Sequence, residues 1–441
     1  MAKWELSKYT VVFRSESGDA IFHNSFMGAI AVIPSNKFSK LENDLHREID
    51  EKHFADNCLK ELCENGFFFP THIDEKDFVE KILEKENSST NFDLVILPHE
   101  NCNFRCNYCY ETHQGGIMED EIVAGLKSFI NSKVRECSGL SVRWFGGEPL
   151  LARDIIYQLS DSFLQSCERE GIPYSSHITT NAYLLTADVV TELLKRKINK
   201  FQITFDGPEI IHDKTRKLAN GGKTFQKILS NLQEMKKRDV DFYVSIRVNF
   251  NNDSAAVMED LFQEMSENFV NDPRYGLYFR PISKYGGPND DNLEICQPEY
   301  AKLIEMELTK NYSQFGYLDK LVKRSLQPHG QVCYAAKESS IIIGADGTVY
   351  KCSVAFENPN NHVGKLYPDG SLKIDKVLWD LWVANPDSDS SKCSSCPVKP
   401  ICQGKYCPRY TIKFKHPICA MKAEEYGKLV QIASSYNGSL L

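Results

Sequence analysis

Three cysteines in the segment CNFRCNYCY could together bind a metal centre. Cys102, Cys106 and Cys109 form one tight triplet, and no fourth cysteine follows them in this segment. A structural zinc site uses four ligands, commonly supplied as two close pairs, so the triplet fits zinc poorly. Three thiolates on a 4Fe-4S cube leave one iron open, and an open iron can bind a substrate or cofactor. The triplet therefore predicts an iron-sulfur centre that takes part in chemistry.

The triplet follows the first of six apolar runs that alternate with segments suited to one helix each. The runs are FDLVILP, LSVRWFG, YSSHITT, KFQITFD, FYVSIRV and GLYFRPI. This alternation predicts an α/β fold with six βα units in series, as an open parallel sheet or part of a (β/α)6 TIM-like barrel. Chemistry in such folds lies on the loops after the carboxyl ends of strands. The motifs GGEP, TNA and FDGP follow the second, third and fourth runs, where these loops are expected.

Taken together, these motifs resemble the radical S-adenosylmethionine (SAM) superfamily, whose Cys-x3-Cys-x2-Cys motif has an aromatic residue before its last cysteine, here Tyr108. The resemblance implies that the triplet holds a 4Fe-4S cluster with SAM on its open iron. A reduced cluster would cleave SAM to methionine and a 5'-deoxyadenosyl radical. The positions that match the family's SAM-contacting motifs are Tyr108, Gly146, Gly147, Glu148, Thr180, Asn181, Thr204, Asp206 and Arg216.

Two positions in these motifs, Ala182 and Asp206, leave a point open. Ala182 stands where the family's Thr-Asn-Gly segment has glycine, which leaves the local backbone shape open. Asp206, at a strand end, is also a weak candidate for a catalytic acid or base, although SAM binding explains it as well.

The last third of the chain carries seven cysteines whose order resembles the SPASM extension, which holds two auxiliary iron-sulfur clusters. The resemblance assigns the distal cluster to Cys393, Cys396, Cys402 and Cys419, and the proximal cluster to Cys333, Cys352 and Cys407. With the SAM cluster, three 4Fe-4S clusters are expected.

Two features of this extension depart from the family pattern. The spacings on both sides of Cys407 differ from those of the family, so an exchange of ligands between the auxiliary clusters stays open. Full members also have an eighth ligand where this chain has Ser339. The proximal cluster therefore either has an open iron or takes a ligand from elsewhere, such as the peptide substrate or Cys296.

Composition restricts the classes of function. The 441 residues are 42% hydrophobic and 25% charged, which is ordinary for a globular protein of two or three domains. The net charge of -8 gives no broad basic surface for nucleic acid. No apolar run approaches a membrane span and no signal peptide is visible, so a cytoplasmic protein without a membrane partner is expected.

Four further cysteines lie in segments with a helical pattern and are expected to pack in cores: Cys58, Cys63, Cys137 and Cys167.

Three domains are expected. Residues 1–90 contain three apolar runs typical of an antiparallel meander, then helical segments, the second ending at Gly66. This make-up suggests a winged-helix-like module that resembles the leader-recognition elements of peptide-maturing enzymes. Residues 91–285 form the radical SAM partial barrel. Residues 286–441 form the SPASM domain, with a hairpin turned at Asp346-Gly347.

The function that this resemblance implies is maturation of a ribosomally made peptide. The leader of a precursor peptide would dock on residues 1–90, and hydrogen abstraction from its core would lead to a thioether or carbon-carbon crosslink. A flavodoxin or ferredoxin type of protein would supply single electrons. Two alternatives stay open: an anaerobic sulfatase-maturase-like enzyme that makes formylglycine, and a non-catalytic iron-sulfur electron carrier.

Overall fold

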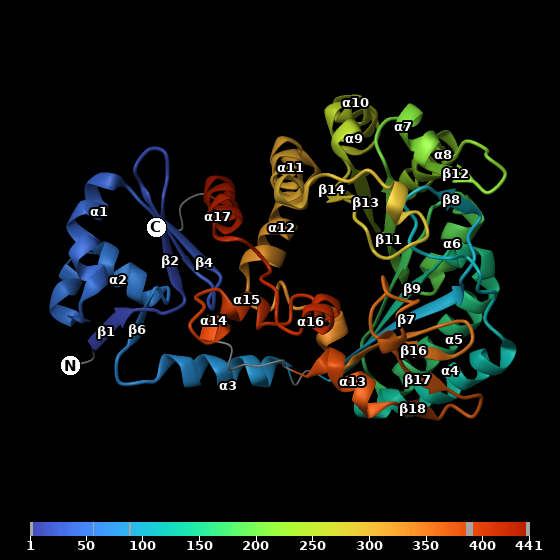
Figure 1. Cartoon of the computed structure of the whole chain (residues 1–441), viewed down its shortest axis with the longest axis horizontal. Helices are drawn as coiled ribbons and strands as arrows, with labels where there is room; N and C mark the ends of the chain where they lie inside the picture. The colour runs from blue at the N-terminus through green and yellow to red at the C-terminus, as the bar shows by residue number, and fades with distance from the viewer. Residues whose placement is uncertain (1–2, 56, 88–89, 385–390, 438–441) are drawn as a thin grey trace. The chain divides into compact units, whose positions relative to one another are not determined.

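The computed structural model describes residues 3–55, 57–87, 90–384 and 391–437, which form two compact units (Figure 1). Each unit is built from segments that are distant in sequence. One, called here the sheet unit, contains residues 90–317 and 338–382; the other, the terminal unit, contains residues 1–89, 318–337 and 383–441. In the described ranges, no helix is long and apolar enough to cross a membrane.

The six predicted strands of the α/β region are confirmed and lie side by side in one sheet. Their order is β14-β13-β11-β10-β9-β7, and every neighbouring pair is parallel. The strands are β7 (Asn91–His99), β9 (Gly139–Gly146), β10 (Tyr174–Thr179), β11 (Ile198–Phe205), β13 (Tyr243–Phe250) and β14 (Tyr275–Pro281).

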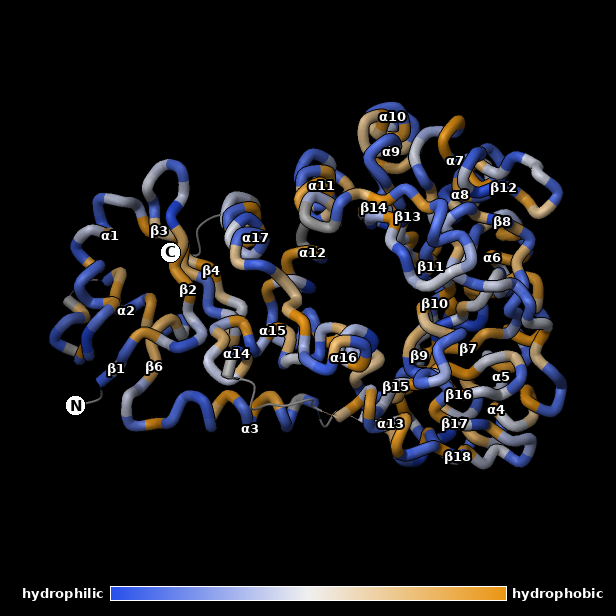
Figure 2. The backbone as a smooth tube through the Cα atoms, viewed as in Figure 1, coloured by the Kyte–Doolittle hydropathy of each residue, from blue (hydrophilic) through white to orange (hydrophobic). Residues whose placement is uncertain are grey.

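Alternation along the strands explains the two faces of this sheet. In β13, Val244, Ile246 and Val248 are fully buried, whereas Ser245 and Arg247 on the opposite face are half-buried. The apolar face is covered by the connecting helices, as contacts of α5 with β9 and of α6 with β11 show (Figure 1). These helices are α4 (Asp120–Lys133), α5 (Arg153–Glu170), α6 (Ala187–Lys195), α8 (Phe225–Lys236) and α10 (Met258–Phe269). Along such helices the tube in Figure 2 changes between hydrophobic and hydrophilic, as amphipathic packing requires.

The predicted hairpin is confirmed and extends the same sheet. β15 (Ser340–Ile343) pairs with β16 (Thr348–Tyr350) through a turn in which Gly347 has a φ of +87°. β15 also pairs in parallel with β7, which places Ile342 opposite Val95. β17 (His362–Leu366) and β18 (Leu372–Ile374) continue the sheet in antiparallel order, and α13 (Lys376–Val383) follows.

The terminal unit begins with short antiparallel sheets. The predicted meander is confirmed as β2 (Thr10–Arg14), β3 (Ala20–Asn24) and β4 (Ala29–Ile33). A second sheet has the order β5-β1-β6, made of Ile49–Asp50, Lys3–Leu6 and Phe68–Pro70. A core that includes Phe22, Phe38 and Leu62 joins these sheets to α1 (Ser35–Leu41) and α2 (Asn57–Glu64). Helix α3 (Glu75–Asn87) packs through Val79 and Leu83 in a separate cluster with Tyr9.

The C-terminal helices belong to this terminal unit. Helix α17 (Ala423–Asn437) contacts β3 and β4. The buried His23 of β3 is hydrogen-bonded to the hydroxyl of Tyr426 in α17 and, at 3.1 Å, to the carbonyl of Leu326. The other helices are α12 (Tyr317–Leu326), α14 (Ser391–Ser394), α15 (Lys399–Cys402) and α16 (Pro408–Phe414). The winged-helix-like and SPASM assignments of these segments stay predictions.

Candidate active site at the carboxyl edge of the sheet

The cysteine triplet lies in the loop after β7, at the carboxyl edge of the parallel sheet. Within this loop, β8 (Phe104–Cys106) pairs with β12 (Arg216–Leu218), which places Cys106 opposite Arg216. The amide of Asn107 donates to the carbonyl of Thr215 over 3.1 Å. The loop after β7 is therefore held by the segment that follows β11.

The three thiols of the triplet are half-buried and close enough to influence one another. Burial raises the pKa of Cys102 and Cys106, and it raises that of Cys109 to about 12. The charge of Cys106 contributes to the raised pKa of each of the other two thiols, whereas Arg216 opposes the rise at all three.

A single metal ion does not suit this part of the chain. In the described ranges, no three His, Cys, Asp or Glu side chains converge as one ion would need. A 4Fe-4S cube binds each thiolate through a different iron, so its ligands surround the cluster and do not meet at one point.

Tyr108 connects the cluster loop to three other segments through its hydroxyl. It donates to Asp206 Oδ1 over 2.9 Å and accepts from Arg216 Nη1 over 2.7 Å. Asn249 Nδ2 donates to the same hydroxyl over 3.0 Å and to Asp206 Oδ1 over 3.3 Å. Thr215 Oγ1 donates to Asp206 Oδ2 over 2.8 Å. We call these five residues, Tyr108, Asp206, Thr215, Arg216 and Asn249, the tyrosine network.

Within this network both carboxylate oxygens of Asp206 are hydrogen-bonded. Burial raises the pKa of Asp206, and the nearby charge of Arg216 opposes this rise. The arrangement supports a role in holding Tyr108 more directly than a role in proton transfer.

Glu148 joins the loops after β9 and β10. Its side chain is fully buried; Oε1 accepts from Thr180 Oγ1 over 2.7 Å, and Oε2 accepts from the amide of Asn181 over 2.7 Å. Asn181 Nδ2 in turn donates to Asn103 Oδ1 in the cluster loop over 2.7 Å. The GGEP motif, the TNA motif and the cluster loop are thus connected by side chains, as expected if they form one site.

Glycines allow close backbone approach beside the triplet. A Cβ on Gly147 would lie 2.3 Å from the carbonyl oxygen of Asn101, so only glycine fits there. Gly287, which follows β14, is packed against the other side of the loop: a Cβ on it would lie 2.4 Å from the Cα of Tyr110. The cluster loop is enclosed between these two backbone segments.

Ala182 has a left-handed backbone, a conformation that glycine adopts more easily than other residues. Its φ is +60°, in the left-handed region, and its side chain is fully buried. The amide of Ala182 donates to Thr180 Oγ1 over 3.0 Å, and its carbonyl accepts from Asn231 Nδ2 over 2.8 Å. These contacts maintain the turn in spite of the Cβ.

The donor set fits an iron-sulfur cluster and a cofactor that carries a carboxylate. Three thiols lie in one loop, and Arg216 brings a buried positive charge whose Nε has no hydrogen-bond partner among the described residues. A guanidinium beside thiolates offsets part of the negative charge of a cluster. Cys102, Cys106 and Cys109 are therefore the residues that would hold it. Thr204, also predicted to contact SAM, is buried at the end of β11.

Sequence reasoning missed Asn249, Thr215 and Asn103. Asn249 had a visible signal, because polar residues alternate in the strand YVSIRVNF and Asn249 is the one nearest its carboxyl end. Thr215 directly precedes the predicted Arg216 in the sequence, yet no spacing rule distinguishes it. Asn103 could be found only from its contact with Asn181.

The four predicted distal ligands lie together in the terminal unit. The charges of Cys393, Cys396 and Cys419 each add to burial in raising the pKa of Cys402, to about 11. The segment of Cys333 is hydrogen-bonded to the segment that follows Cys402, because the amide of Cys333 donates to the carbonyl of Lys405 over 3.0 Å. Cys407, like Cys333, belongs to the terminal unit, whereas Cys352 belongs to the sheet unit.

The remaining cysteines lie apart from these groups. Cys58 and Cys63 pack against the core of the terminal unit, and Cys167 is buried in α5. The helical placement of Cys137 was wrong: it follows the 3-10 turn Val134–Glu136 that ends α4, with its thiol against the carbonyl of Lys133 at 3.1 Å. Cys296 is buried just before α11 (Pro298–Asn311). Ser339, at the position of the family's eighth ligand, accepts a hydrogen bond at its carbonyl from the amide of Asp93.

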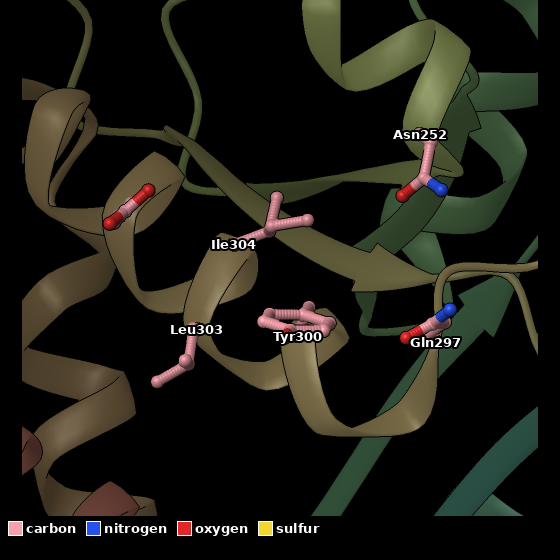
Figure 3. A pocket seen from close by; sticks show the side chains of 6 residues that line it. Asn252, Gln297, Tyr300, Leu303 and Ile304 are labelled. Atoms are coloured by element: carbon pink, nitrogen blue, oxygen red, sulfur yellow. The ribbon is translucent and has the colours of Figure 1, made fainter.

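An open pocket lies between α11 and α9 (Asn252–Ala256), which follows β13 (Figure 3). Its volume is about 510 Å³, and it is lined by Asn252, Gln297, Tyr300, Leu303, Ile304 and Glu307. The side chain of Tyr300 is 58% exposed. The ion pair of the buried Glu305 with Arg280 of β14 holds α11 to the sheet, and Glu305 also pairs with Lys302 within the helix.

The family comparison identifies a domain within the sheet unit. Residues 96–264 match the radical SAM superfamily. The curated relatives include the cysteine-type anaerobic sulfatase-maturating enzyme of Clostridium perfringens (strain 13 / Type A), which is 25% identical over 70% of this chain and 87% of its own length. The radical SAM cyclopropyl synthase TigE of Paramaledivibacter caminithermalis is 23% identical over 90% of this chain and 88% of its own length.

A solved structure shows the same fold. It is described as native anSMEcpe with bound AdoMet and Cp18Cys peptide, and it superposes with a TM-score of 0.57 at 20% identity. The match covers 78% of this chain and 99% of that one.

Proposed function

We propose that this chain, which carries a radical SAM domain and is related to sulfatase maturases and a cyclopropyl synthase, is a peptide maturase. It would abstract a hydrogen atom from a ribosomally made peptide and form a thioether or carbon-carbon crosslink. The observation that carries the proposal is the cysteine triplet at the carboxyl edge of the sheet, in a loop that is hydrogen-bonded to the loops after β10 and β11 and to β13 itself. The match to the synthase extends over 90% of the chain.

The residues around the cysteine triplet have separate proposed roles. A bound 4Fe-4S cluster and SAM would supply a 5'-deoxyadenosyl radical. Cys102, Cys106 and Cys109 would hold the cluster, and Gly146 and Gly147 would let the backbone approach the cofactor. Glu148 keeps the GGEP and TNA loops together. The tyrosine network keeps the cluster loop in place, because its hydrogen bonds join that loop to β13 and to Arg216.

The proposed enzyme would use two protein partners and two auxiliary clusters. A precursor peptide would dock its leader on residues 1–90, and its core would enter the mouth of the barrel. A flavodoxin or ferredoxin type of protein would supply electrons. Cys393, Cys396, Cys402 and Cys419 would hold the distal auxiliary cluster, and Cys333, Cys352 and Cys407 the proximal one.

A second candidate is supported by the sulfatase-maturase relative, which is matched over 87% of its own length, against 88% for the synthase. In this reading the substrate is a Cys or Ser of a protein that becomes formylglycine. The two functions share SAM cleavage and differ in the product.

The decisive experiment is anaerobic incubation of the reconstituted protein with dithionite and SAM. We expect 5'-deoxyadenosine, and we expect none from Cys106→Ser. Absence of 5'-deoxyadenosine from the wild-type protein, with or without peptide, would overturn both enzymatic readings. Tandem mass spectra of candidate precursor peptides then separate the two functions. A crosslink removes two hydrogens and joins two residues, so fragment ions from the chain between them are missing. Formylglycine formation changes a single residue, with loss of two hydrogens from Ser, or the same loss and exchange of sulfur for oxygen from Cys, and the aldehyde reacts with a hydrazine.

Iron content tests the proposed clusters independently of turnover. Three 4Fe-4S clusters require about twelve irons per chain. Cys106→Ser and Cys396→Ser should each lower the content by about four irons, whereas Cys167→Ser, at a buried cysteine in α5, should leave it unchanged. A wild-type content near four would remove the auxiliary clusters from the proposal.

A further inference from the structure

The polar face of the parallel sheet is basic, although the chain carries a net charge of -8. Register pairs place His177 of β10 beside Arg143 of β9 and Lys200 of β11. Burial, together with the charges of these two neighbours, lowers the pKa of His177 to about 4. Among the residues of the seven parallel strands, all of which are described, Asp93 is the single acidic one.

Arg247 is the basic residue of this face that lies nearest the tyrosine network. It stands opposite Thr204 of β11 and Tyr278 of β14 in the sheet register. Its Nε donates to Asn249 Oδ1 over 2.7 Å, and the amide nitrogen of Asn249 donates to Tyr108 and Asp206. One edge of the guanidinium is thereby fixed in direction close to the predicted SAM site.

The charge of Arg247 is not matched by a carboxylate in the part of the chain that the structure describes. Its neighbour Arg280 differs, because it forms an ion pair with the buried Glu305. No such pair involves Arg247, whose side chain is half-buried and keeps its terminal N–H groups accessible. A guanidinium with one edge anchored and the other accessible suits bidentate binding of a carboxylate.

We propose that Arg247 binds a carboxylate of the peptide substrate, either an Asp or Glu side chain or the C-terminal group, beside the predicted SAM site. This inference rests on the proposed function and names the kind of peptide that the site accepts. The basic face would attract such a peptide, and Arg247 would fix its position relative to the tyrosine network. The other source of a carboxylate is SAM itself, and the experiment separates the two.

The test uses the reconstituted, SAM-loaded enzyme and two small probes, N-acetylglutamate methylamide and N-acetylglutamine methylamide. Isothermal titration should show that the wild-type protein binds the glutamate probe about tenfold more tightly than the glutamine probe. Arg247→Gln should abolish this preference, and Arg247→Lys should retain part of it. The affinity for SAM should change less than about threefold in Arg247→Gln. Arg169→Gln, on the outer surface of α5, is the matched control and should keep the preference.

Two results would overturn the inference. One is equal binding of the two probes by the wild-type protein, which includes no binding of either at about 20 mM. The other is a large loss of SAM affinity in Arg247→Gln, which would assign the guanidinium to the cofactor. Titration needs no turnover, so a wild-type protein that prefers the glutamate probe but forms no 5'-deoxyadenosine would contradict the proposed function and leave this site standing. Circular dichroism of each variant shows that it is folded.

Discussion

Tyr108 illustrates how one residue can fix the position of a metal-binding loop. Its backbone lies between Cys106 and Cys109, and its hydroxyl is bonded to three side chains from later segments: Asp206, Arg216 and Asn249. A phenylalanine would serve the apolar part of this position equally well. The hydroxyl therefore has its role in the network, where it separates the charges of Arg216 and Asp206 while bonding to both.

Removing this hydroxyl should weaken the sheet unit. Tyr108→Phe removes the partner of Arg216 Nη1 and leaves Asp206 Oδ1 with only the longer bond from Asn249, which costs about 1–3 kcal/mol in the free energy of unfolding. Denaturant unfolding of the apoprotein followed by circular dichroism measures this loss. Tyr183→Phe is the matched control, since the ring of Tyr183 packs on Phe104 and its hydroxyl forms no hydrogen bond to a described residue. Equal stability of the two variants would contradict the importance of the network.

Ala182 combines two opposing effects. Its left-handed backbone is strained by about 1 kcal/mol or more relative to glycine, while burial of its methyl group contributes about 0.8 kcal/mol. Ala182→Gly should therefore change the free energy of unfolding by less than about 1 kcal/mol.

A matched substitution separates the two effects. Ala152 is also buried but has a φ of -116°, so Ala152→Gly relieves no strain and should cost about 1–2 kcal/mol. Thermal and denaturant unfolding compare the two variants. If Ala182→Gly were as destabilising as Ala152→Gly, the left-handed turn would not be strained in solution.

At the scale of elements, β15 joins the cysteine-rich region to the barrel-like sheet. Three isoleucines, Ile341, Ile342 and Ile343, are buried in a strand of four residues, and the strand pairs in parallel with β7. The cluster loop follows β7 directly. Packing of β15 therefore supports the strand that carries the triplet, and Cys352 follows β16 only a few residues later.

Two Ile→Ala substitutions, one buried and one more exposed, measure this support. Ile342→Ala removes a fully buried side chain and should lower the free energy of unfolding by about 2–5 kcal/mol. Ile374→Ala, in β18 where the side chain is 36% exposed, should cost less than half as much. Denaturant unfolding monitored by circular dichroism provides both values. Similar losses at the two positions would show that β15 is not part of the cooperative sheet.

At the scale of the molecule, His23 ties the first residues of the chain to the last helix. Burial lowers its pKa to about 4, from an ordinary value near 6.5 in the unfolded chain. A histidine with a lowered pKa contributes stability that is complete above the unfolded value and is lost as the pH falls from 6.5 toward 4.

The terminal unit should therefore be sensitive to acid. The shift corresponds to about 3 kcal/mol between pH 7 and pH 4. His23→Gln should be less stable than the wild type at pH 7 and show a flatter dependence on pH, measured as the melting temperature between pH 7.5 and pH 4.5. His46→Gln, at an exposed histidine of the same unit, should follow the wild-type profile. Parallel profiles for wild type and His23→Gln would exclude this role.

The sequence alone determined the six parallel strands, the hairpin at Asp346-Gly347 and the three motifs around the cysteine triplet. Each of these depends on local patterns: strand alternation, turn residues and fixed spacings that survive whatever the rest of the chain does. The order of the strands also follows, because successive βα units place each strand beside the last one.

Only the tertiary structure decided which distant segments meet. The contact of Asn181 with Asn103 joins positions 78 residues apart, that of Tyr108 with Asn249 joins positions 141 residues apart, and β15 pairs with β7 across a still longer separation. No spacing rule predicts such pairs, because a side-chain hydrogen bond depends on the three-dimensional placement of both partners. Arg247 is the clearest case. In the sequence it is an ordinary residue of a strand, and the lack of a carboxylate partner is visible only when the neighbouring strands are placed in register.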